Sequence, residues 1–137
     1  MTIPESPRFD AVGVTVSDME RSLVFYRLLG LEFPDDSAGE SHVTATLPGG
    51  ARLMLDTIGL MQTIDPNFEV PTSRAAMTLA FACTSPSGVD SLHASLVEAG
   101  FESHLAPFDA FWGQRYATVL DPDGTRVDLY ARLAATT

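Results

Sequence analysis

The same order of secondary-structure signals occurs twice along this chain: a strand, a helix, and then two strands joined by a turn. In both halves the first strand alternates between larger apolar residues and small or polar ones, as strands with two different faces do. Each following helix has an N-cap residue, helically spaced apolar residues and a closing glycine. We therefore predict one α+β domain over 1–137, built from two copies of a module whose residue identity is weak.

The first module spans about 8–56 and the second about 75–133, with a connector over 57–74. The connector contains several larger apolar residues, so we expect it to pack on the modules. The elements predicted in the first module are a strand over 9–16, a helix over 19–29 ended by Gly30, and strands over 41–47 and 51–56. Those predicted in the second module are a strand over 77–83, a helix between Ser85 and Gly100, and strands over 114–120 and 125–130.

The length of 137 residues and the 45% hydrophobic content fit one ordinary globular domain. The net charge of −10 repels nucleic acid and anionic lipid, so we predict neither nucleic-acid nor membrane partners. The acidity either favours cationic or neutral ligands or only keeps the protein soluble. A single cysteine, the lack of a long apolar run and an N-terminus without a secretory pattern predict a cytoplasmic location.

One face of each sheet must receive the helix, and the β-branched and aromatic strand residues are suited to it. The opposite face carries small residues along the first strands, such as Gly13 and Ala80, and polar residues along the hairpin strands, such as Arg52. An antiparallel sheet can simply expose such a face to water. The small residues in both modules and the size of Met54 and Tyr116 favour instead a concave face that binds a ligand.

Two segments resemble a known superfamily. Residues 9–33, FDAVGVTVSDMERSLVFYRLLGLEF, resemble the opening module of glyoxalase, bleomycin-resistance and extradiol-dioxygenase proteins, the vicinal oxygen chelate superfamily. Residues 112–130, WGQRYATVLDPDGTRVDLY, resemble its closing hairpin. The resemblance implies two βαβββ modules in an open, barrel-like sheet with a cleft, the glyoxalase/bleomycin resistance fold. It leaves the reaction open, because this fold hosts several chemistries.

The enzymes of that superfamily hold a divalent metal through four strand positions, and the resemblance maps these onto Ala11, Met54, Thr78 and Asp128. Of the four, Asp128 alone is a good ligand for a hard cation, which needs several converging donors. Asp56 lies two residues beyond the matching position. We therefore expect no bound metal and no cofactor, and the resemblance points to the metal-free, bleomycin-resistance-like branch.

That branch contains drug-sequestering homodimers whose clefts can be shared between two chains. The resemblance thus implies a homodimer that binds an aromatic or heterocyclic small molecule, antibiotics included. The aromatic residues around 108–112 could line the rim of the cleft or pack the modules together. The residues predicted to bind the ligand are His42, Arg52, Met54, Asp56, Phe68, Phe111, Trp112, Gln114, Tyr116, Arg126, Asp128 and Tyr130.

The alternative is an enzyme, a metal-dependent or metal-free lyase, isomerase or dioxygenase of the glyoxalase superfamily. A metal-free catalyst would use His42, Tyr116 or Asp128. We assign no catalytic residue, because His42 fits a partly exposed histidine at a strand end better than an acid or base. His93 in the second helix and His104, expected in a loop, are predicted to be structural. A third possibility is a fold that serves only for dimerisation, which a filled cleft would indicate.

Overall fold

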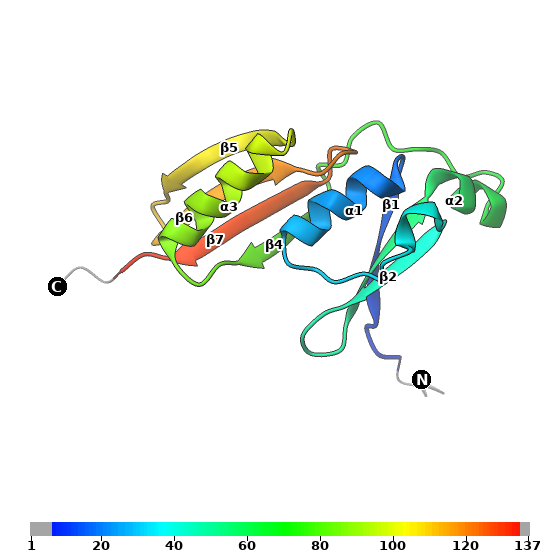
Figure 1. Ribbon diagram of the computed structural model, residues 1–137, viewed down its shortest axis with the longest axis horizontal. Coiled ribbons are helices and arrows are strands. Elements are labelled where there is room, and N and C mark those ends of the chain that lie inside the picture. The colour runs from blue at the N-terminus through cyan, green and yellow to red at the C-terminus, as the bar shows by residue number, and fades with distance from the viewer. Residues whose placement is uncertain (1–6, 135–137) are drawn as a thin grey trace, which may run out of the picture.

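The computed structural model describes residues 7–134, and its elements follow the predicted two-module order (Figure 1). Module 1 consists of β1 (Ala11–Val16), α1 (Met19–Leu28), the 3-10 turn η1 (Ser37–Gly39), β2 (His42–Thr46) and β3 (Arg52–Thr57). The connector contains α2 (Ile58–Ile64). Module 2 consists of β4 (Thr78–Ala82), α3 (Pro86–Glu98), β5 (Glu102–Asp109), β6 (Gln114–Leu120) and β7 (Arg126–Arg132).

Each module has its own mixed sheet. The first has the strand order β1-β3-β2 and the second the order β4-β7-β6-β5. The first strand of each module pairs in parallel with the last, and the other pairs are antiparallel. Within the described residues the sheets stay open and close no barrel. The predicted α+β architecture with a repeated module is confirmed.

The signals at the helix ends act as expected. The side chains of Asp18 and Ser85 accept hydrogen bonds from backbone N–H groups in the first turns of α1 and α3. Gly30 and Gly100 follow the two helices with φ of +92° and +95°, in the left-handed region that favours glycine. The helix ends are therefore set by local chemistry that the sequence alone reveals.

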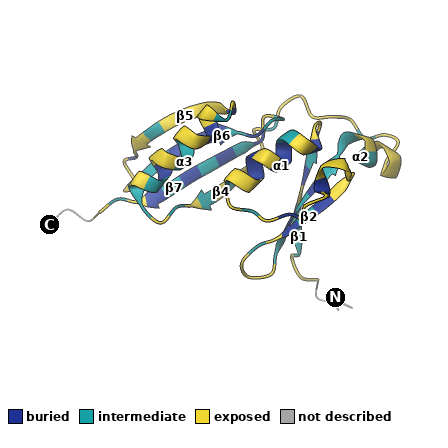
Figure 2. Cartoon of the chain, in the orientation of Figure 1, coloured by how far each residue is buried: buried dark blue, intermediate teal, exposed yellow. Residues whose placement is uncertain are grey.

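The hydrophobic core lies between the sheets and the helices, which cover one face of each sheet (Figures 1 and 2). Helix α1 also joins the two modules. The Phe25 ring meets the Phe101 ring edge-on at 5.0 Å, and the Tyr26 hydroxyl donates to Asp121 at 2.7 Å. Arg21 donates to the Ala99 carbonyl at 2.9 Å. The modules therefore meet through a buried helix contact.

Two predictions about local structure were wrong. His104 lies in strand β5, not in a loop. Seven of the eight β5 residues are exposed and Pro107 interrupts the strand, so the alternation that would mark it is missing. Module 1 also departs from the full βαβββ pattern: between α1 and β2 it has η1 in place of a strand.

The connector packs less tightly than expected. Helix α2 contacts β1 and β3, but none of its residues is buried and Ile64 is 68% exposed. Figure 2 shows this mainly exposed surface on α2. No helix in the part of the chain that the structure describes is long and apolar enough to cross a membrane.

Candidate functional site

The face of each sheet that lies away from α1 and α3, called here the open face, carries most of the predicted ligand-binding residues. In module 1 the strand register sets Gly13 beside Met54 and Thr15 beside Asp56. In module 2 it sets Ala80 beside Asp128. The period-two pattern therefore assigned the two faces correctly. The apolar residues of the opposite face, such as Leu55, Val127 and Leu129, are fully buried under the helices.

A hydrogen-bonded cluster surrounds Asp128 on the open face of module 2. Its two carboxylate oxygens accept from the hydroxyls of Tyr116 and of Thr118, the latter at 2.7 Å. The Arg126 guanidinium lies 3.7 Å from the carboxylate. Desolvation and then the hydrogen bond to Asp128 raise the pKa of Tyr116. The cluster presents a fixed carboxylate and a phenol that keeps its proton well into the alkaline range.

Four aromatic rings extend from this cluster to the edge of the sheet. The Tyr116 ring meets Trp112 edge-on at 5.2 Å and Phe108 at 5.8 Å, and Trp112 in turn meets Phe111 at 5.0 Å. Trp112 also donates to the Gln114 side chain at 2.8 Å. Phe111 is 97% exposed and Trp112 48% exposed. These rings do not pack the two modules together; they form an exposed aromatic wall.

A second cluster lies on the open face of module 1. The Nδ1 atom of His42 is 2.5 Å from the Asp56 carboxylate, and its Nε2 atom is 3.1 Å from the Thr44 hydroxyl. The hairpin turn sets His42 directly opposite Asp56. The imidazole is thus held between a carboxylate at Nδ1 and a hydroxyl at Nε2. In the neutral tautomer that carries its proton on Nδ1, the Nε2 atom is a proton acceptor.

Arg52 and Met54 complete the module 1 face. Arg52 donates to Asp10 at 2.7 Å, so its charge is paired at the sheet edge and not with Asp56. A Cβ atom added to Gly13 would lie 3.6 Å from the Met54 methyl and 3.7 Å from Asp56. The glycine thus leaves the space in front of these side chains open.

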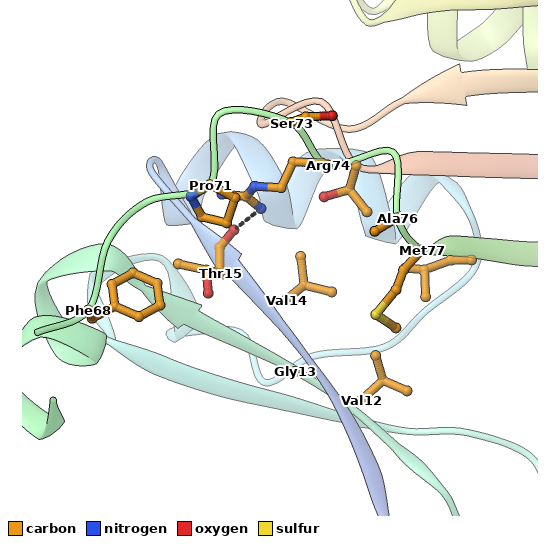
Figure 3. Close-up of a pocket in the computed structure, with 12 residues that line it drawn as sticks. Val12, Gly13, Val14, Thr15, Phe68, Pro71, Ser73, Arg74, Ala76 and Met77 are labelled. Atoms are coloured by element: carbon orange, nitrogen blue, oxygen red, sulfur yellow. Dashed lines mark hydrogen bonds between the residues drawn. The ribbon is translucent and has the colours of Figure 1, made fainter.

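The structure brings the predicted residues together in two groups, one on each sheet, that no hydrogen bond or ion pair joins within the described residues. Tyr130 belongs to the second group, because it lies opposite Tyr116. Phe68 belongs to neither and lines a cavity beside β1 (Figure 3). Sequence reasoning left out the partner hydroxyls of Thr44 and Thr118, although both have the parity of the open face.

The residues at the four family metal positions do not fit a metal ion. Ala11 and Thr78 lie opposite Arg52 and Arg126, so each sheet brings a cation next to the position. Both Asp128 oxygens already accept hydrogen bonds. In residues 7–134 no group of three or more His, Cys, Asp or Glu side chains could hold an ion. We therefore assign no chemistry through a metal at this site.

Solved structures with the same fold come from several bacteria. A glyoxalase-related enzyme from Fulvimarina pelagi superposes with a TM-score of 0.78 at 21% identity, covering 91% of this chain and 88% of its own. A glyoxalase/bleomycin resistance protein/dioxygenase family enzyme from Burkholderia phytofirmans gives 0.72 at 18% identity, covering 93% and 100%. A protein of unknown function from Agrobacterium tumefaciens gives 0.72 at 26% identity, covering 94% and 97%.

No curated protein sequence matches the chain. The family is nevertheless clear from the sequence, because residues 8–129 match the model of the Glyoxalase/Bleomycin resistance protein/Dioxygenase superfamily. The match extends from β1 into β7 and so includes both open faces. The expected family resemblance is confirmed: this chain belongs to the glyoxalase/bleomycin resistance protein/dioxygenase superfamily.

Proposed function

We propose that the protein binds an aromatic or heterocyclic small molecule without a metal, in the manner of drug-sequestering members of its superfamily. The observation that carries this proposal is the aromatic wall beside Asp128 on the open face of module 2. Trp112, Phe111 and Tyr116 offer large, stiff surfaces on which a flat ligand can stack. Asp128 adds a carboxylate that favours cationic ligands over anionic ones.

The two groups of predicted residues support a homodimer with shared clefts. In one chain they lie on separate sheets, and a cleft lined by both would form if the open face of module 1 met module 2 of a second copy. Exposed apolar residues such as Phe108 and Met77 would be covered in such an assembly. Light scattering at micromolar concentration should give twice the chain mass of 14.7 kDa, and a monomeric mass would contradict the dimer. A cytoplasmic location remains part of the proposal.

Ligand binding can be followed directly, because Trp112 is the single tryptophan of the chain and lies in the proposed site. Protein dialysed against EDTA is titrated with bleomycin, mitomycin C and the flat cation proflavine, and the tryptophan emission is recorded. We expect saturable, stoichiometric quenching by one of these compounds. The variant Trp112→Ala, tested by calorimetry, should lose about tenfold or more in affinity, as removal of one stacking partner does.

Two further variants separate the contributions. Asp128→Asn should weaken proflavine about tenfold and leave an uncharged ligand nearly unchanged, because the carboxylate acts through its charge. Val97→Ala is the matched control, since Val97 is 44% exposed on helix α3, away from the open face. Equal affinity in Trp112→Ala and Val97→Ala would show that the aromatic wall is not the binding site.

One observation favours a second candidate, metal-free acid–base catalysis. The Asp56–His42–Thr44 chain fixes the orientation of an imidazole whose Nε2 atom, when it carries no proton, could take one from a carbon acid next to a carbonyl. In deuterated water this activity would exchange the carbon-bound hydrogens of a substrate such as dihydroxyacetone, as seen by NMR. His42→Gln should abolish the exchange. His93→Gln should keep it, because His93 pairs with Ser103 elsewhere. Equal rates in both variants and in buffer would exclude this candidate.

A further inference from the structure

A cavity of about 260 Å³ lies in the gap between the modules, between β1 and residues 68–77 of the connector and β4. Figure 3 shows Phe68 at one end, Met77 and Val12 at the other, and Arg74 reaching across to the carbonyl of Thr15. At about 30 Å³ per water molecule, this volume corresponds to a ligand of about nine heavy atoms. The cavity is separate from the Asp128 and His42 clusters, and none of their residues lines it.

The cavity carries one formal charge, and that charge is positive. Its walls are mostly apolar, contributed by residues such as Val14, Met77 and Leu79, and none of the acidic residues within 7–134 lines it. Arg74 is its lone ionisable side chain, and within the described residues no carboxylate lies within 4.0 Å of the guanidinium. The cavity is therefore positively charged, although the protein as a whole has a net charge of −10.

Two buried polar atoms at the cavity have no partner. They are the Nε atom of Arg74 and the Oγ1 atom of Thr125, which belongs to a residue with 8% of its surface exposed. A buried donor without an acceptor costs about 1–3 kcal/mol, so such groups are rare and call for a ligand, an ion or a water molecule. The Nε–H group of Arg74 requires an acceptor, and the Thr125 hydroxyl can donate to the same one.

The nearest buried carboxylate does not supply that acceptor. Asp121 accepts from the Tyr26 hydroxyl through one oxygen. Its other oxygen accepts from the backbone N–H groups of Asp123 and Thr125. Both Asp121 oxygens are therefore occupied by other donors, and Asp121 forms no ion pair with Arg74. Among the described residues the Arg74 guanidinium makes one hydrogen bond, to the Thr15 carbonyl, so four of its five N–H donors have no partner there.

We propose that this cavity binds a small apolar monocarboxylate, with its carboxylate on Arg74 and Thr125 and its apolar part between Phe68 and Met77. A carboxylate has two acceptor oxygens, which suit a guanidinium and a hydroxyl donor together. Arg74 as a whole is partly exposed, so the anion can approach the guanidinium from the cavity. A change in the side-chain rotamer of Arg74 then lets its Nε–H group and the Thr125 hydroxyl donate to the carboxylate. This site is independent of the aromatic ligand proposed above.

Calorimetric titration of the whole protein with phenylacetate tests the proposal, with phenylacetamide as the uncharged analogue of the same shape. We expect saturable millimolar or tighter binding of phenylacetate, and at least tenfold weaker binding of the amide. Trp112 lies outside this cavity, so its emission should not change. Arg74→Met should weaken phenylacetate at least tenfold, whereas Arg27→Met, which removes an exposed cation on helix α1 outside the cavity, should leave its affinity unchanged.

The Thr125→Val variant keeps the test decisive if Arg74→Met folds poorly. Valine has nearly the shape of threonine and loses only the unpartnered hydroxyl, so the fold should persist while phenylacetate affinity falls several-fold. Three results would overturn the proposal: no saturable binding of phenylacetate at millimolar concentration, equal binding of the acid and the amide, or a loss of affinity in Arg27→Met but not in Arg74→Met.

Discussion

Two buried threonines allow a sharp test of the hydrogen-bond assignments, because the same substitution should change stability in opposite directions. Thr118 is fully buried and its hydroxyl donates to Asp128 at 2.7 Å. Thr125 is 8% exposed and its hydroxyl has no partner among the described residues. Thr→Val removes a hydroxyl from each at nearly constant volume. Comparing the free energies of unfolding of the two variants therefore shows what a buried hydroxyl contributes with a hydrogen-bond partner and without one.

The magnitudes follow from that difference. Thr118→Val loses a hydrogen bond to a charged acceptor, and such bonds contribute about 1.5–3 kcal/mol, so the free energy of unfolding should fall by that amount. Thr125→Val removes a hydroxyl whose burial costs about 1–3 kcal/mol without compensation, so the ligand-free protein should become about 1 kcal/mol or more stable. The two variants should thus differ by about 2.5 kcal/mol or more.

Urea unfolding at neutral pH, followed by circular dichroism, gives both values. The dependence of the free energy on urea should be unchanged, because neither substitution alters the surface exposed on unfolding. A loss of about 1 kcal/mol or more in Thr125→Val would show that its hydroxyl has a partner, such as a bound water molecule. That result would remove one of the two observations on which the carboxylate site depends.

The remaining predictions concern proton binding and backbone geometry. Burial and the bond to Asp128 raise the pKa of Tyr116, so its contribution to stability is complete below the pKa of free tyrosine and is lost as the pH rises through the higher folded value. Ultraviolet titration should show this late phenolate step in the native protein and not in Tyr116→Phe. Gly30→Ala should cost about 1–2 kcal/mol, the penalty for a left-handed residue with no contact within 4 Å. Gly100→Ala should cost more, because the new Cβ would lie 2.9 Å from an Arg21 nitrogen, which would have to leave its hydrogen bond to the Ala99 carbonyl. Equal costs of the two substitutions in thermal unfolding would contradict this reasoning.

The fold could be predicted largely because its signals are local. Alternation along 12–16 separates the buried Val14 and Val16 from the more open Gly13 and Thr15, and the turn glycines mark both hairpins. Strand β5 could not be found in the same way. It lies at a sheet edge, contains a proline and has two irregularities in its register, so its side chains show no two-residue period.

The candidate site was predictable only in part. Strand parity placed His42, Asp56 and Asp128 on the open faces, but their partners depend on cross-strand register. Counting back from the hairpin turn would have paired His42 with Asp56. Arg74 is a different case, because it bonds to Thr15, 59 residues away, and lies beside Thr125 in the cavity. These contacts of Arg74 depend on the path of the connector across the gap between the modules. No local sequence pattern predicts that path.

The central claim is that this chain binds a flat aromatic or heterocyclic molecule through its own side chains and without a metal. The most direct measurement is calorimetric titration of the protein with the compound that quenches Trp112, performed in EDTA and again with added nickel, zinc, iron or manganese. We expect the same affinity and a stoichiometry set by the number of clefts in both conditions. Binding that appears only with an added metal would contradict the account.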